Sequence, residues 1–146
     1  MTALAFVALA LVAAVARGAK LTPETEEAIR TNKQIYVSTR RRDGSESKVV
    51  PVWFMYDGDA ILFTTGPKSH KARRIRHGSP LFVRVGSASA PRFEGHAELV
   101  DDPTVAARMA PVYKQKYWIA WLGFFVPDPD RVRTGKTAIV RVTPAQ

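Results

Sequence analysis

The sequence predicts a mainly β domain with short helices, arranged as a small antiparallel barrel of six strands. Short runs of β-branched and aromatic residues alternate with turn signals, and the predicted helices are brief. Two Asp-Gly pairs separate the first three runs, as is typical of hairpin turns. The 146 residues suffice for one hydrophobic core, so a single domain over 20–146 is expected after an apolar N-terminal segment.

The first half of this domain predicts one helix and three strands. The helix begins at Pro23, with Thr22 as its N-cap, and runs to about Asn32. The pattern then changes to strands at 35–39, 49–56 and 60–65. The tight turns between them are Asp43-Gly44 and Asp57-Gly58. Three strands joined by two such turns predict an antiparallel meander.

The second half predicts two more helices and three more strands. Ser69 caps a short helix over 70–77, which Gly78 ends. Another helix begins with Asp102-Pro103 and runs to about Met109. The strands are expected at 81–86, 92–99 and 136–143. The stretch 113–125 is aromatic and has no clear period.

Residues 1–19 form an apolar segment, which includes an uninterrupted apolar run at 3–16. A helix over residues 1–16 spans about 24 Å, less than the ~30 Å hydrocarbon core of a bilayer. The cations Arg17 and Lys20 follow the run, which favours a cytoplasmic domain anchored through residues 1–16 to the inner face of the membrane. The sequence leaves three alternatives open: a signal peptide cleaved near Ala14–Ala16, a helix packed on a partner subunit, and a mis-assigned start.

The chain is strongly basic, with 22 Lys and Arg against 13 Asp and Glu, a formal net charge of +9. Such a balance predicts an anionic partner: nucleic acid, a phospholipid surface or a phosphorylated ligand. Acidic residues are absent from 60–93, where seven cations lie: Lys68, Lys71, Arg73, Arg74, Arg76, Arg84 and Arg92. Aromatic residues do not interleave with the cations of 68–76, so nucleic-acid binding is not expected.

The helix predicted at 70–77 starts among donors that suit a phosphate. Lys68, Ser69, His70 and Lys71 surround its opening, and three arginines follow along it. The alternative is a solvated basic helix face. The chain has no cysteine, which excludes disulfides, cysteine zinc sites and thiol nucleophiles.

Pro51 interrupts an apolar strand, which places that strand at a sheet edge or a bulge. We expect the neighbouring backbone groups of Val50 and Val52 to be free to bond a planar heterocycle. Thr64 and Thr65 end the next strand and supply hydroxyls nearby. The alternative is an edge strand that its proline merely protects from pairing.

Three segments together carry a resemblance: Lys-Val-Val-Pro-Val-Trp at 48–53, Phe-Thr-Thr at 63–65 and Ser-His-Lys-Ala at 69–72. They resemble the pyridoxamine 5′-phosphate oxidase-like split-barrel superfamily, and its flavin- and deazaflavin-dependent oxidoreductase branch most closely. The resemblance covers about residues 21–143. It implies a homodimeric six-stranded split barrel that binds FMN or the 8-hydroxy-5-deazaflavin coenzyme (F-420) between subunits.

Matching positions imply the cofactor site. Lys71 falls on the phosphate ligand of the family, and His70 stands where the oxidases usually have arginine. The full set of cofactor-binding candidates is Lys48, Val50, Pro51, Val52, Trp53, Thr64, Thr65, Lys68, Ser69, His70, Lys71 and Arg74. The substrate-binding signature of the true oxidases, rich in arginine and histidine, has no match in 131–146, which argues against vitamin B6 oxidation.

The resemblance therefore implies an oxidoreductase that transfers a hydride to or from a small organic substrate, lipophilic if the anchor holds. The cofactor carries this chemistry, so no protein nucleophile is expected and no catalytic residue is assigned. The alternative is a cofactor- or haem-binding split barrel that acts as a carrier or sensor. The aromatic cluster Trp118, Trp121, Phe124 and Phe125 has four interpretations: a substrate-pocket wall, a cofactor-stacking surface, a membrane interface and a dimer core.

Overall fold

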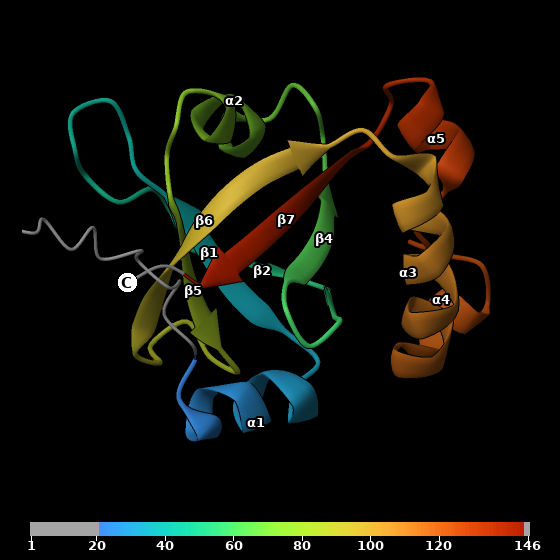
Figure 1. The fold of residues 1–146 in the computed structure, drawn as a ribbon, viewed down its shortest axis with the longest axis horizontal. Coiled ribbons are helices and arrows are strands. Elements are labelled where there is room, and N and C mark those ends of the chain that lie inside the picture. Colours follow the sequence, from blue (N-terminus) through green and yellow to red (C-terminus); the bar gives the residue numbers. More distant parts are fainter. Residues whose placement is uncertain (1–20, 145–146) are drawn as a thin grey trace, which may run out of the picture.

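A computed structural model describes residues 21–144, where seven strands form one antiparallel sheet (Figure 1). The strands are β1 (Ile35–Thr39), β2 (Val50–Val52), β3 (Met55–Tyr56), β4 (Ile61–Thr65), β5 (Leu81–Val85), β6 (Arg92–Val100) and β7 (Ala138–Pro144). The helices are α1 (Pro23–Thr31), α2 (His70–Arg76), α3 (Pro103–Lys116), α4 (Trp118–Trp121) and α5 (Pro129–Arg133). The mainly β prediction with short helices is confirmed for this part of the chain.

The two outer strands of the sheet are consecutive in the chain. The order is β2-β1-β5-β6-β7-β4-β3, so β2 and β3 form opposite edges, although only Trp53 and Phe54 separate them. The single strand predicted over 49–56 therefore bends at these two residues and serves both edges, which raises the strand count from six to seven. Both antiparallel pairings of the predicted meander are present, β1 with β2 and β3 with β4, but they lie at opposite edges of the sheet because the middle strand is divided.

Both predicted Asp-Gly turns are present. Gly44 has a φ of 87° and Gly58 a φ of 95°, the left-handed region that glycine enters without strain. The Asp57 carboxylate accepts hydrogen bonds from the amides of Asp59 and Ala60, at 2.9 and 2.8 Å. These bonds fix the turn between β3 and β4.

The barrel interior is one of two hydrophobic cores. Strand side chains fill it, and Ile29 of α1 packs against them. Its members include Val37, Phe54, Phe63, Leu81, Val83 and Val140, all fully buried. Gly95 is needed on β6, because a Cβ there would lie 2.3 Å from Cγ1 of Val142. We call this cluster the barrel core.

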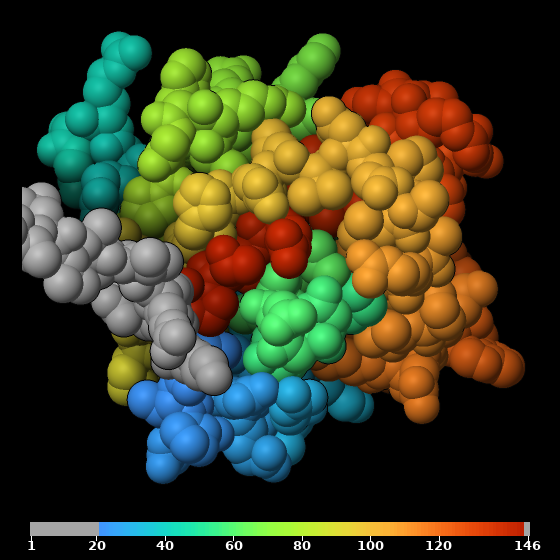
Figure 2. Space-filling view, in the orientation of Figure 1, coloured from blue at the N-terminus to red at the C-terminus, as the bar shows by residue number. Residues whose placement is uncertain are grey.

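The second core lies between the sheet and the helices α3 and α5 (Figure 1). It contains Met55, Leu62, Val105, Met109, Tyr113, Tyr117, Val132 and Ile139, and we call it the helical-layer core. Figure 2 shows α3 (orange) against the turn before β4 (green). Helix α3 begins after Asp102 as predicted, but it continues past Met109 to Lys116, with Pro111 inside it. Packing of Tyr113 in this core outweighs the proline.

The sequence also predicts an apolar helix and a membrane anchor within residues 1–19, which lie outside the described residues. Within 21–144, every helix is too short or too polar to cross a bilayer.

The N-caps of α1 and α2 are as predicted. The Thr22 hydroxyl accepts from the amide of Thr25, and the Ser69 hydroxyl accepts from the amide of Ala72.

Candidate cofactor site

An open cavity of about 340 Å³ lies where strand β2 approaches the end of α3. Its size falls in the lower part of the range usual for small-molecule sites. It is lined by Gln34, Pro51, Val52, Trp53, Thr64, Tyr113 and Phe125, and we call it the Trp53 cavity. Four predicted cofactor contacts therefore meet here: Pro51, Val52, Trp53 and Thr64.

The register of β2 corrects one expectation about its backbone. Pro51 pairs with Tyr36 of β1, while Val50 and Val52 pair with the residues on either side. Proline has no N–H, so its pair is the non-hydrogen-bonded one, and the ladder bonds run through Val50 and Val52. Their backbone groups are therefore not free for a ligand. The carbonyl of Pro51 points to the open edge instead.

The bend between β2 and β3 is held by side chains from the end of α3. The Tyr113 hydroxyl donates to the carbonyl of Trp53 at 2.9 Å, and the Lys116 ammonium donates to that of Phe54 at 3.1 Å. The Tyr117 hydroxyl accepts from the amide of Phe54 at 3.0 Å and donates to the carbonyl of Lys33 at 2.6 Å. Burial raises the pKa of Tyr117 to about 12 and that of Tyr113 further still, so both remain protonated donors.

Aromatic contacts fix the orientation of the Trp53 indole. It stacks on Tyr117 with ring centroids 4.3 Å apart and an angle of 6° between the planes. Phe125 meets the indole edge-on, at 5.9 Å and 87°. Phe125 has a φ of 58°, unusual for a residue with a Cβ, and its side chain is 77% exposed. One wall of the cavity is thus rigid and the opposite wall is an exposed ring.

Lys71 lies half-buried near the far end of β4. Its Nζ is 5.5 Å from the centroid of the Phe63 ring, and burial lowers the pKa of its ammonium. Within 21–144 no carboxylate pairs with it. The hydroxyls of Thr65 and Ser69 lie 3.3 Å apart beside the same strand end. A half-buried cation without a carboxylate partner and two hydroxyls suit a phosphate.

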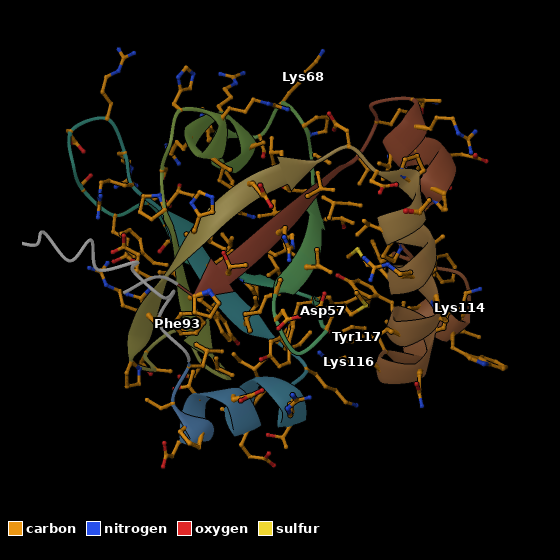
Figure 3. The ribbon with its side chains drawn as sticks, viewed as in Figure 1. Asp57, Lys68, Phe93, Lys114, Lys116 and Tyr117 are labelled. Carbon is orange, nitrogen blue, oxygen red and sulfur yellow. The ribbon has the colours of Figure 1, made fainter. Side chains whose placement is uncertain are left out.

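The residues present therefore fit a flat ring that carries a phosphate. Thr64 lines the Trp53 cavity, and Thr65, the next residue, contacts the cap of α2. The aromatic side chains of the Trp53 cavity suit the ring, and Lys71 with the hydroxyls of Thr65 and Ser69 suits the phosphate. Lys68 is exposed and extends away from the molecule (Figure 3). Lys48 is also exposed, and Val50 packs toward the barrel core.

His70 and Arg74 line a different hollow, of about 670 Å³. It lies between α2 and the hairpin before β2, which are side by side in Figure 2 (lime and teal). The other basic residues that line it are Arg40, Arg41, Arg42, Arg73 and His77. Arg76 turns back instead, and its Nη1 donates to the carbonyl of Pro67 at 2.6 Å. The arginines of α2 therefore do not all face one ligand.

Two cations of the acid-free stretch are already paired. Arg84 and Arg92 contact the carboxylate of Glu46 at 2.7 and 2.8 Å. The hydrogen bond from Arg84 is the main cause that lowers the pKa of Glu46 to about 2. The stretch lacks acidic residues in sequence, but a glutamate from the preceding hairpin neutralises part of it.

Sequence reasoning missed Gln34 and Tyr113 as cavity residues, and Lys116 and Tyr117 as the groups that hold the bend, whereas Phe125 belongs to the aromatic cluster for which a pocket wall was one interpretation. One signal was available for part of this set. Tyr113 and Tyr117 are four residues apart, which puts them on one face if the segment is helical. The expected helix end near Met109 hid that relation.

The sequence matches a family model described as pyridoxamine 5′-phosphate oxidase over residues 21–146. No curated protein matches the chain significantly. Among solved structures, an F420 reductase is 24% identical with a TM-score of 0.58, and the match covers 83% of this chain and 93% of that one.

Two further solved structures are similar. The haem storage protein from Vibrio cholerae is 14% identical with a TM-score of 0.58, and the match covers 88% of this chain and 92% of that one. A flavocytochrome from Azotobacter vinelandii is 14% identical with a TM-score of 0.59, with coverage of 86% and 65%. At these identities the likenesses show a shared fold. The family match covers all of the described residues and establishes that the chain belongs to the pyridoxamine 5′-phosphate oxidase family of split-barrel proteins.

Proposed function

We propose that this protein is an oxidoreductase that binds FMN or the deazaflavin coenzyme F-420 and transfers a hydride to or from a small organic substrate. The observation that supports the proposal is the link at the end of β4: Thr64 lines the Trp53 cavity, and the Thr65 hydroxyl contacts Ser69, the cap of the helix that carries Lys71. We infer that a ring bound in the Trp53 cavity extends its phosphate along this strand toward Lys71.

The residues of the chain would bind and shield such a cofactor. Trp53 supplies a flat face whose orientation Tyr117 fixes, and Thr64 supplies a hydroxyl at the cavity wall. Lys71 neutralises the phosphate. Because Lys71 is half-buried, solvent screens its charge less, which strengthens this interaction. A flavin or deazaflavin supplies the hydride chemistry when bound, and the protein contributes position and exclusion of water.

A homodimer is part of this proposal. Phe125 lines the Trp53 cavity, and large apolar side chains that precede it in the chain are exposed, at 73% for Trp118, 72% for Trp121 and 61% for Phe124. An exposed apolar patch of this kind is typical of an interaction surface. A second copy of the chain would cover it and close the cavity, and size-exclusion chromatography with light scattering tests this directly.

A paired titration tests cofactor binding and the role of Lys71. The purified full chain is titrated with FMN, with F-420 and with riboflavin, which has the ring of FMN but no phosphate. We expect binding of FMN or F-420, and a loss of about tenfold or more in Lys71→Ala, because a charge-assisted contact is removed. Lys68→Ala is the matched control, since Lys68 is exposed.

The riboflavin arm separates a phosphate contact from damage to the fold. Lys71→Ala should leave riboflavin affinity unchanged if Lys71 acts on the phosphate alone. Reduction of the bound cofactor by candidate donors then tests turnover. A chain that binds neither FMN nor F-420 but takes up haem would overturn the proposal in favour of a haem carrier.

A further inference from the structure

A second cavity, of about 420 Å³, lies beside the Trp53 cavity and shares Gln34 and Trp53 with it. Its other lining residues are Asn32, Lys33, Gly86, Lys116, Tyr117, Trp118 and Ile119. We call it the Lys116 cavity. The family resemblance assigns none of the residues that line the Lys116 cavity alone.

The ammonium of Lys116 has more donors than the protein satisfies. Its Nζ lies 3.3 Å from the centroid of the Phe54 ring and donates to the carbonyl of Phe54 at 3.1 Å. Among residues 21–144 this carbonyl is its one hydrogen-bond acceptor, and no carboxylate pairs with it. An ammonium has three N–H donors; the carbonyl accepts from one and the Phe54 ring covers one side of the group, which leaves a donor for a ligand.

The surroundings of Lys116 favour an anion with an aromatic body. Lys33 lines the same cavity, and none of its lining residues is acidic. The whole stretch 103–127 is free of Asp and Glu. Trp53, Tyr117 and Trp118 provide ring faces and edges, which bind aromatic groups through stacked or edge-on contacts.

We propose that the Lys116 cavity binds an aromatic carboxylate, with the carboxylate on the Lys116 ammonium and the ring between the indoles of Trp53 and Trp118. This site goes beyond the proposed function, because it needs no bound flavin. Its position next to the Trp53 cavity would bring such a ligand against the same indole that faces the cofactor.

Binding of 2-naphthoate tests the site, with uncharged 2-naphthamide as its isostere. Both are titrated calorimetrically into the flavin-free full chain, and the quenching of tryptophan fluorescence reports the location. We expect naphthoate to bind at least about tenfold more tightly than naphthamide. Lys116→Met, which keeps the apolar stem, should remove this preference and leave naphthamide binding unchanged.

Lys114→Met is the matched control. Lys114 lies two residues away on the outer side of α3, whereas Lys116 faces the barrel (Figure 3). Loss of naphthoate binding in both variants would indicate a general effect of charge on α3 and would contradict the assigned site. Thermal melting of both variants checks that the bend and the helix stay folded.

The pH dependence of naphthoate affinity distinguishes a lysine that binds the ligand from one that only supports the fold. Burial lowers the pKa of Lys116 to about 8, and the other titratable groups that line its cavity are Lys33 and Tyr117. Naphthoate affinity should therefore fall as the pH rises above about 8, because the ammonium loses its proton. The step should be absent in Lys116→Met. Equal affinity for acid and amide, or a flat profile in the wild type, overturns the proposal.

Discussion

The barrel core and the helical-layer core exclude water in different ways. Aliphatic and phenylalanine side chains fill the barrel core, and the sheet ladders satisfy the backbone around it. The helical-layer core contains Tyr113 and Tyr117, whose hydroxyls bond to backbone groups at the bend of the barrel. The first core thus contributes stability through packing, while the second also positions Trp53 between two cavities.

The two cores also differ in whether candidate ligand cavities border them. Tyr113 and Tyr117 of the helical-layer core line the two aromatic cavities, whereas no buried residue of the barrel core does. Hydrogen bonds hold the Tyr117 hydroxyl at the bend, and the Tyr117 ring in turn orients the Trp53 indole by stacking. Substitutions in the barrel core should therefore affect the whole fold, whereas loss of a single hydroxyl in the helical layer should also affect ligand binding.

The largest effect is expected in the barrel core. Phe63→Ala should lower the free energy of unfolding by about 3–5 kcal/mol, because Phe63 is fully buried and its removal leaves a cavity. Urea denaturation measures it. Phe124→Ala is the control, since Phe124 is 61% exposed, and it should change stability by less than about 0.5 kcal/mol. Comparable losses in both variants would contradict the assignment of the core.

A smaller effect is expected in the helical layer. Tyr117→Phe removes the hydroxyl that bonds the amide of Phe54 and the carbonyl of Lys33. Leaving these groups unsatisfied should cost about 1–3 kcal/mol. Tyr36→Phe is the matched control, because its hydroxyl makes one exposed contact of 3.4 Å to Gln34. Tyr117→Phe should also weaken ligand binding at both cavities, and undiminished binding would show that the bend does not depend on Tyr117.

The smallest effect concerns a polar group outside both cores. Glu46→Gln should destabilise the fold by about 1–2 kcal/mol at neutral pH, because the carboxylate accepts charge-assisted bonds from Arg84 and Arg92. Glu98→Gln is the control. Glu98 pairs with Arg141 at 3.5 Å on the surface, so a change of about 0–0.5 kcal/mol is expected.

The same carboxylate predicts a pH dependence. The pKa of Glu46 is lowered from 4.5 to about 2 in the fold, so its contribution is present above pH 4.5 and is lost as the pH falls toward 2. Denaturation midpoints measured between pH 7 and pH 2 should converge for wild type and Glu46→Gln. A difference that persists unchanged at pH 2 would contradict this reading.

Much of the barrel could be predicted because its signals are local. The Thr22 and Ser69 caps, the two Asp-Gly turns and the β-branched strands each depend on neighbouring residues. The division of 49–56 at Trp53 and Phe54 could not, because it depends on which strands form the edges of the sheet. No local pattern records that choice.

The candidate site was predictable in part. The motif residues Pro51, Trp53 and Thr64 do share one cavity, although they come from two strands. Phe125 does not follow from any periodicity, because a loop brings it to the indole at a positive φ. The pairing of Arg84 with Glu46 also escaped prediction, since 38 residues separate them in the chain.

A crystal structure of the protein grown with FMN or F-420 tests the central claim most directly, namely that the bend at Trp53 presents one ring-binding wall beside a phosphate site. We predict the ring in the Trp53 cavity, against Pro51 and Thr64, with its phosphate on the Lys71 ammonium. A ring bound elsewhere, with Lys71 still packed over Phe63 and no phosphate near it, would contradict the account.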